Sequence, residues 1–242
     1  MTRSLRRQLR FLHAYAAVTT IGFAVMAAAA FRQAPKAQNL GEITVERINV
    51  VDANGTLRLV ISNKDRMHPG VIGGKTLQRP RPYAGFLFFN DQGDESGGLT
   101  FRGREENGRR VADSGLMFDQ LGQDQTIGFD YSEQDRQRSA GFKVWDRPET
   151  PLADLVDQVN AANAIRNEAE RAAALAKVRA AAPKPAQRLF VGKTRDRASS
   201  VVLSDAEGRA RLALKVGADG AAAIEFLDAD GKAVRRVTAD GK

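Results

Sequence analysis

The chain has 242 residues, of which 43% are hydrophobic and 27% charged, and its formal net charge at pH 7 is +8. This composition is that of a globular protein and excludes a largely disordered chain. Cysteine is absent, which excludes disulfide bonds, thiolate zinc sites, cysteine nucleophiles and lipid anchors on cysteine.

The excess positive charge does not indicate a nucleic-acid partner. Four arginines, Arg3, Arg6, Arg7 and Arg10, lie just before an apolar segment, where they have a simpler explanation. The remaining Lys and Arg residues are spread among Asp and Glu, as in residues 102–110, and a mixture of both signs is typical of a solvated surface. We therefore expect no nucleic acid among the partners.

Residues 11–31 form an apolar segment with no residue that must be charged at pH 7. As a helix the segment is roughly 30 Å long, which matches the hydrocarbon core of a bilayer. The basic tail of residues 1–10 predicts a cytoplasmic N-terminus. The sequence thus predicts a single-pass signal-anchor in a bacterial cytoplasmic membrane, with the bulk of the chain in the periplasm or outside.

A cleavable signal peptide is the alternative to an anchor, because residues 27–30 are alanines and suit a cleavage site. The hydrophobic part of a signal peptide usually has only about 7–15 residues. The length of the apolar segment therefore favours the anchor.

After a linker at residues 32–41, apolar residues alternate with polar ones in a first β domain at residues 42–148. Ile48 and Val50 are expected on one face of a strand, and Leu57, Leu59 and Ile61 on one face of the next. Further short strands are predicted at residues 86–89, 99–101, 116–118, 126–131 and 142–145. The run at 86–89 is apolar on both faces, which predicts a position inside a sheet or sandwich.

A turn pattern of Asp or Asn followed three residues later by Gly recurs along the chain. It occurs at residues 52–55, 90–93, 119–122, 205–208 and 228–231. Asp at the first position bonds the backbone ahead of it, and Gly at the fourth accepts positive φ, as in a type I turn closed by a bulge. The repeats predict β-hairpins, including a C-terminal set at residues 188–242 with strands at 201–203, 211–216, 223–227 and 233–237.

Residues 150–182 predict one long amphipathic helix between the β regions. Thr150 is placed to cap it, Pro151 suits its first position, and Pro183 and Pro185 end it. Its apolar stripe would lie against a sheet or against copies of itself.

The predicted fold is mainly β: an N-terminal transmembrane helix is followed by antiparallel β-hairpin repeats, arranged as a sandwich, a barrel or a stacked repeat, and interrupted by one long amphipathic helix.

The sequence contains no complete motif for most catalytic or metal-binding sites. Residues 69–76 end like a phosphate-binding loop, but Pro69 replaces its first Gly and no helix can follow soon. The two histidines, His13 and His68, are too few for a zinc site. We therefore predict no catalytic residue, no metal and no cofactor. A hydrolase that uses the acidic loop residues Asp91, Asp94 or Glu95 is a weaker alternative.

The loop at residues 63–84 is long for a hairpin connection, and long ordered loops are often functional. Its basic residues are candidates for binding an anion: Lys64, Arg66, Lys75, Arg79 and Arg81.

Two functions follow as hypotheses. The first is a membrane-anchored extracytoplasmic β-repeat protein with a structural, scaffold or self-assembly role, without catalysis and as a homo-oligomer. The C-terminal β segment is small enough to need a packing partner. The second is a module that binds an anionic envelope lipid, polymer or protein through loop 63–84.

Overall fold

The fold was analysed in a computed structural model that describes residues 3–31, 39–77 and 80–241. Residues 32–38 of the predicted linker therefore lie outside the described residues, as does the candidate Arg79. The chain forms two compact units, Met1–Thr44 and Val45–Lys242, and each is treated by itself.

The first unit contains the helix α1 (Arg3–Phe31), which is long and apolar enough to span a membrane. Up to residue 29 its side chains are exposed. Thr19 donates its hydroxyl to the backbone oxygens of Tyr15 and Ala16, so this polar side chain is satisfied within its own helix. A signal sequence near the N-terminus can also meet this criterion of length and apolar composition.

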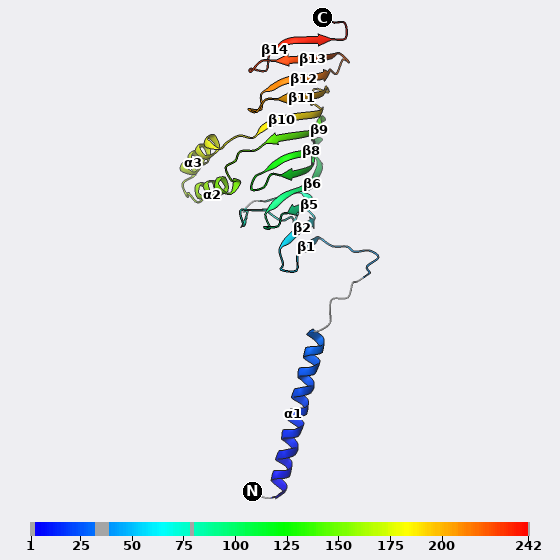
Figure 1. The fold of residues 1–242 in the computed structure, drawn as a ribbon, viewed down its shortest axis with the longest axis vertical. Helices are drawn as coiled ribbons and strands as arrows, with labels where there is room; N and C mark the ends of the chain where they lie inside the picture. The colour runs from blue at the N-terminus through cyan, green and yellow to red at the C-terminus, as the bar shows by residue number, and fades with distance from the viewer. Residues whose placement is uncertain (1–2, 32–38, 78–79, 242) are drawn as a thin grey trace. The chain divides into compact units, whose positions relative to one another are not determined.

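The second unit is built on one open sheet of twelve strands, in which each strand pairs antiparallel with the next one in the order β1-β2-β5-β6-β7-β8-β9-β10-β11-β12-β13-β14 (Figure 1). The strands are β1 (Arg47–Val51), β2 (Leu57–Ser62), β5 (Ala84–Phe89), β6 (Glu95–Glu106), β7 (Arg109–Asp119), β8 (Gln125–Gln134), β9 (Gln137–Asp146), β10 (Ala186–Lys193), β11 (Ser199–Ser204), β12 (Ala210–Val216), β13 (Ala222–Leu227) and β14 (Ala233–Thr238).

This arrangement confirms the predicted mainly β fold and selects the stacked repeat among its three forms. The two predicted β regions belong to the same sheet, because β9 and β10 pair along seven positions from Ala186 to Lys193. A separate two-stranded hairpin, β3 (Val71–Ile72) and β4 (Lys75–Thr76), lies within loop 63–84.

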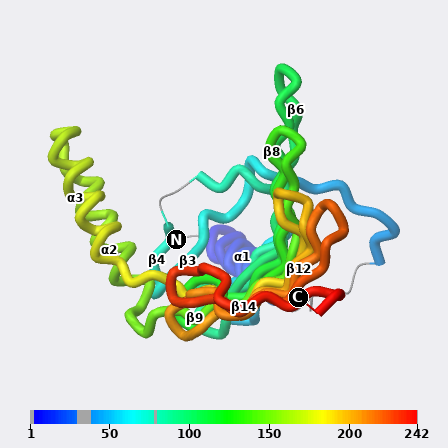
Figure 2. The backbone as a smooth tube through the Cα atoms, turned by 90° about the horizontal axis from the view of Figure 1, so that it is seen from above, coloured from blue at the N-terminus to red at the C-terminus, as the bar shows by residue number. Residues whose placement is uncertain are grey.

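Several strands are longer than predicted. The hairpins β6–β7 and β8–β9 reach beyond their neighbours when the sheet is seen along the stack (Figure 2). Their tips are polar on both faces, so alternation does not reveal them; the β6–β7 tip turns at Asn107 and Gly108, which both have positive φ.

The predicted turns form with a shared geometry. In four of them the Gly N–H donates to the carbonyl of the first turn residue, as Gly55 does to Asp52 and Gly208 to Asp205. The fifth is displaced by one residue, because Gln123 donates to Gln120. Each of these five hairpins also has a register shift beside the turn, so every one of them aligns its strands in the same way.

The prediction of one long helix at residues 150–182 is wrong. The segment forms two helices, α2 (Leu152–Asn163) and α3 (Glu168–Ala181), beside one end of the strands. Asn167 restarts the helix because its side chain accepts the N–H of Glu170. Thr150 does not act as the cap, since Pro151 occupies that position without a side-chain bond.

Candidate assembly surface

One face of the sheet carries an unbroken line of apolar side chains across all twelve strands. Paired residues of adjacent strands share a face, so the pairing register identifies the members of this line. The line, here called the central row, consists of Ile48, Ile61, Phe86, Leu99, Leu116, Phe129, Phe142, Val191, Val201, Leu214, Ile224 and Val237.

A second line, the flanking row, runs parallel to the central row on the same face. It is apolar at ten of its twelve positions and consists of Val50, Leu59, Phe88, Gly97, Phe118, Ile127, Val144, Leu189, Leu203, Leu212, Phe226 and Arg235. The rings of Phe88 and Phe118 stack at 6.1 Å across Gly97. The two rows define the apolar face.

The repeated turn explains why the rows align. In each hairpin with this turn, the flanking-row residue stands two positions before the first turn residue, as Val50 does before Asp52 and Leu203 before Asp205. A constant turn with a constant bulge therefore gives a constant register. Period-2 alternation then brings all the apolar positions to one face.

None of the central-row side chains is buried. Phe129 is 57% exposed, Leu214 42% and Val191 40%. Two shallow apolar hollows of about 680 and 600 Å³ lie over parts of the apolar face, around Leu214 and Phe129 respectively. Monomeric soluble proteins rarely expose a contiguous apolar surface of this extent.

The total exposed surface area is also larger than that of a compact monomer. The chain exposes 17485 Å², whereas a compact monomer of its mass would expose roughly 10,600 Å². Helix α1 is exposed along its length and accounts for part of the excess. The open sheet, which has one layer over most of its extent, contributes to the rest.

One end of the opposite face of the sheet is covered. Val60 and Leu87 are completely or almost completely buried there, and with Phe89 they form a core against Met67 and Val71 of loop 63–84. Loop 63–84 therefore acts as a cover for one end of this face.

The acidic loop after β5 holds this cover in place. The Asp94 carboxylate accepts the N–H groups of Gly73 at 3.0 Å and Gly74 at 2.8 Å. Glu95 forms a bidentate ion pair with Arg81, in which the two side chains are only 10% and 14% exposed. The Gly73-Gly74 backbone, expected to approach a partner, thus binds a carboxylate of its own chain.

The basic candidates of loop 63–84 do not gather into one patch. Those in the described part of the chain each have a carboxylate neighbour: Lys64 has Asp65, Arg66 has Glu46, Lys75 has Asp157 of α2, and Arg81 has Glu95. Their charges are compensated within the chain, which leaves little positive potential for an anionic partner.

The acidic candidates for hydrolysis have structural partners as well. Asp91 pairs with Arg58, in addition to the contacts of Asp94 and Glu95. His68 accepts the N–H of Gly70 through Nδ1 at 3.0 Å, and burial lowers the pKa of its imidazole. Among the described residues, no group of three or more acidic or histidine side chains could hold a metal ion.

A cavity of about 370 Å³ lies between α2 and the cover. Its apolar wall includes Leu155 and Val159, and its polar wall includes Glu95 and Asp119. Burial, together with the charges of Glu95 and Asp124, raises the pKa of Asp119 to about 7. Oδ1 of Asp119 is buried and has no hydrogen-bond partner among the described residues. The sequence pattern placed Asp119 at the start of a turn but gave no sign of its burial, because that burial depends on how α2 docks.

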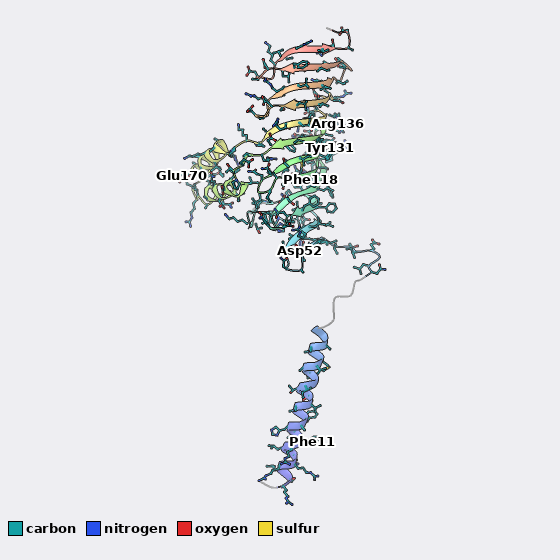
Figure 3. All side chains as sticks on the ribbon, viewed as in Figure 1. Phe11, Asp52, Phe118, Tyr131, Arg136 and Glu170 are labelled. Atoms are coloured by element: carbon teal, nitrogen blue, oxygen red, sulfur yellow. The ribbon has the colours of Figure 1, made fainter. Side chains whose placement is uncertain are left out.

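The wider arrangement of side chains can be followed in Figure 3, where Phe118 and Tyr131 are marked on the adjacent strands β7 and β8, and Glu170 on α3 beside the strands.

Comparison of the chain with models of known protein families and with the sequences of curated proteins found no match.

Proposed function

We propose that this protein is a membrane-anchored extracytoplasmic scaffold that works by associating with copies of itself through the apolar face, without catalysis. The observation that carries the proposal is the central row, in which all twelve strands of one sheet present an apolar side chain and none of these side chains is buried.

The size of the apolar face suits a protein interface. Twelve strands spaced about 4.8 Å apart extend over about 53 Å, and the side chains of two rows cover a width of about 14 Å. The resulting area of about 740 Å² is close to the ~800 Å² that each partner contributes to a stable complex.

A membrane anchor would also favour association between copies. Helix α1 is long enough to keep each copy in a membrane, and confinement to a membrane raises the effective concentration of copies toward one another. The basic N-terminal tail favours a cytoplasmic N-terminus and an exported sheet.

The proposal is tested on the full chain in detergent micelles by sedimentation velocity. We expect the wild type to form a discrete oligomer. Leu214→Asp and Phe129→Asp should weaken association by more than about 100-fold, because each oligomer would bury an unpaired carboxylate against apolar side chains.

Leu121→Asp is the matched control. Leu121 is the more exposed leucine, at 73%, but it lies in a turn and outside both rows. Its substitution should leave the oligomer unchanged. A wild-type protein that remains monomeric at all concentrations would overturn the scaffold proposal.

A further inference from the structure

The charge at the end of the apolar face and the length of the tether limit the relative orientation of two associated copies. We propose that the occupant of the face is a second copy anchored in the same membrane, packed in parallel so that β1 lies nearest to β1 and β14 nearest to β14. This inference rests on the self-association proposed above and adds its orientation.

The short tether between α1 and β1 favours the parallel arrangement. Residues 32–46 connect α1 to β1, and even a fully extended chain of this length reaches only about 50–54 Å. The stack from β1 to β14 extends over about 53 Å. In an antiparallel pair standing away from the membrane, one copy would need its whole tether, fully extended, to hold its β1 beside the distal β14 of the other.

The charge at the end of the flanking row also favours the parallel arrangement. The flanking row is apolar from β1 to β13, apart from Gly97, and ends on β14 with the exposed Arg235. An antiparallel pair would place each Arg235 over β1 of the other copy, beside Val50, and would remove a guanidinium from water without a partner. A parallel pair keeps both Arg235 side chains at the open end of the stack.

The absence of cysteine makes the orientation directly measurable, because a single introduced cysteine is unique in the full chain. Three central-row positions sample the stack: Ile61 on β2, Phe129 on β8 and Ile224 on β13. Each would be replaced by Cys in the membrane-bound protein and treated with a bismaleimide that spans about 10 Å, the usual separation of packed sheets.

The parallel arrangement predicts same-residue dimers from all three variants. The antiparallel arrangement predicts them only from Phe129→Cys, near the middle of the stack, and it predicts mixed dimers when Ile61→Cys and Ile224→Cys are co-expressed. That second pattern would overturn the orientation and leave self-association intact.

Lys215→Cys, on the opposite face of β12, is the control for random collision and should give about an order of magnitude less dimer. If none of the three central-row variants exceeds this control while each stays as resistant to proteolysis as the wild type, the face does not bind a second copy. In that case both the orientation and the proposed function fail. Protection of the same cysteines from a water-soluble maleimide would then identify lipid or α1 as the cover.

Discussion

The two faces of the sheet share one backbone and one hydrogen-bond ladder, yet they differ in the side chains that they carry. The row directly behind the apolar face consists of Arg47, Ser62, Gly85, Thr100, Gly115, Asp130, Gly141, Gly192, Ser200, Lys215, Ala223 and Thr238. It contains no large apolar side chain, whereas the central row contains nothing else.

The chain supplies a cover for one end of the opposite face. At Val60 and Leu87, loop 63–84 packs over that face. On the apolar face, the side chains of the central row stay at least partly exposed along the whole stack. One face is thus partly covered by a loop of the same chain, whereas the central row of the other face is left at least partly exposed.

The largest effect is expected at the ion pair that holds the cover. Arg81→Met would leave the Glu95 carboxylate buried without a partner and should lower the free energy of unfolding by about 3–5 kcal/mol. Urea denaturation of the full chain measures it. Lys75→Met, which breaks a half-exposed pair with Asp157, should cost at most about 1 kcal/mol. Equal losses would mean that Arg81 does not secure the cover.

The next effect compares one leucine from each face. Leu87→Ala, on the covered face, should cost about 2–5 kcal/mol at any protein concentration, because it leaves a cavity. Leu214→Ala should cost about 1 kcal/mol or less in dissociated protein, since its side chain is already 42% exposed. Its cost should rise at concentrations where copies associate. A concentration-independent cost for Leu214 would show that no second copy buries it.

The third effect depends on pH, through Asp119. Its pKa is about 7 in the folded chain, against 3.8 for an ordinary aspartate. Between these values the unfolded chain loses the proton and the folded chain keeps it, so stability falls as pH rises through this window and is level above it. The slope contributed by Asp119 is at most about 1.4 kcal/mol per pH unit.

Asp119→Asn removes this dependence, because the amide stays neutral. Melting temperatures of both proteins from pH 4 to pH 8 should therefore diverge, with the variant gaining relative to the wild type as pH rises. A constant difference across this range would contradict the raised pKa.

The smallest effect concerns two glycines, Gly192 on the opposite face of the sheet and Gly103 on the side of the central row. A Cβ on Gly192 would lie 2.2 Å from the backbone oxygen of Ala140, so Gly192→Ala should cost about 1–3 kcal/mol. Gly103→Ala, whose Cβ meets only the Ala112 side chain at 3.6 Å, should change stability by less than about 0.5 kcal/mol. Thermal unfolding of the two variants distinguishes close strand approach from a general cost of replacing glycine.

Local pattern predicted much of this protein. Alternation located β11 to β14 to within two residues at either end but missed β10. The pattern of Asp or Asn followed three residues later by Gly located five hairpin turns, one of them displaced by a residue, and the apolar run predicted α1. These signals work because strand periodicity, turn chemistry and helix length each depend on residues that are close in sequence. The break between α2 and α3 also had a local signal, since Asn167 is followed three residues later by Glu170 as in a capping box.

Contacts between distant residues decided the rest. Loop 63–84 is basic in sequence, but its pairing with Asp94, Glu95 and Asp157 depends on strands and a helix that the loop pattern does not describe. The burial of Asp119 depends likewise on the docking of α2.

The sequence by itself determined which residues of the predicted strands are apolar and where five of the hairpins turn. Only the tertiary structure decided that the hairpins join into one open sheet instead of two facing sheets, and that their apolar positions form a single line from Ile48 to Val237. The reason is that alternation fixes the two sides of a strand, while strand order and register fix which strands share a side.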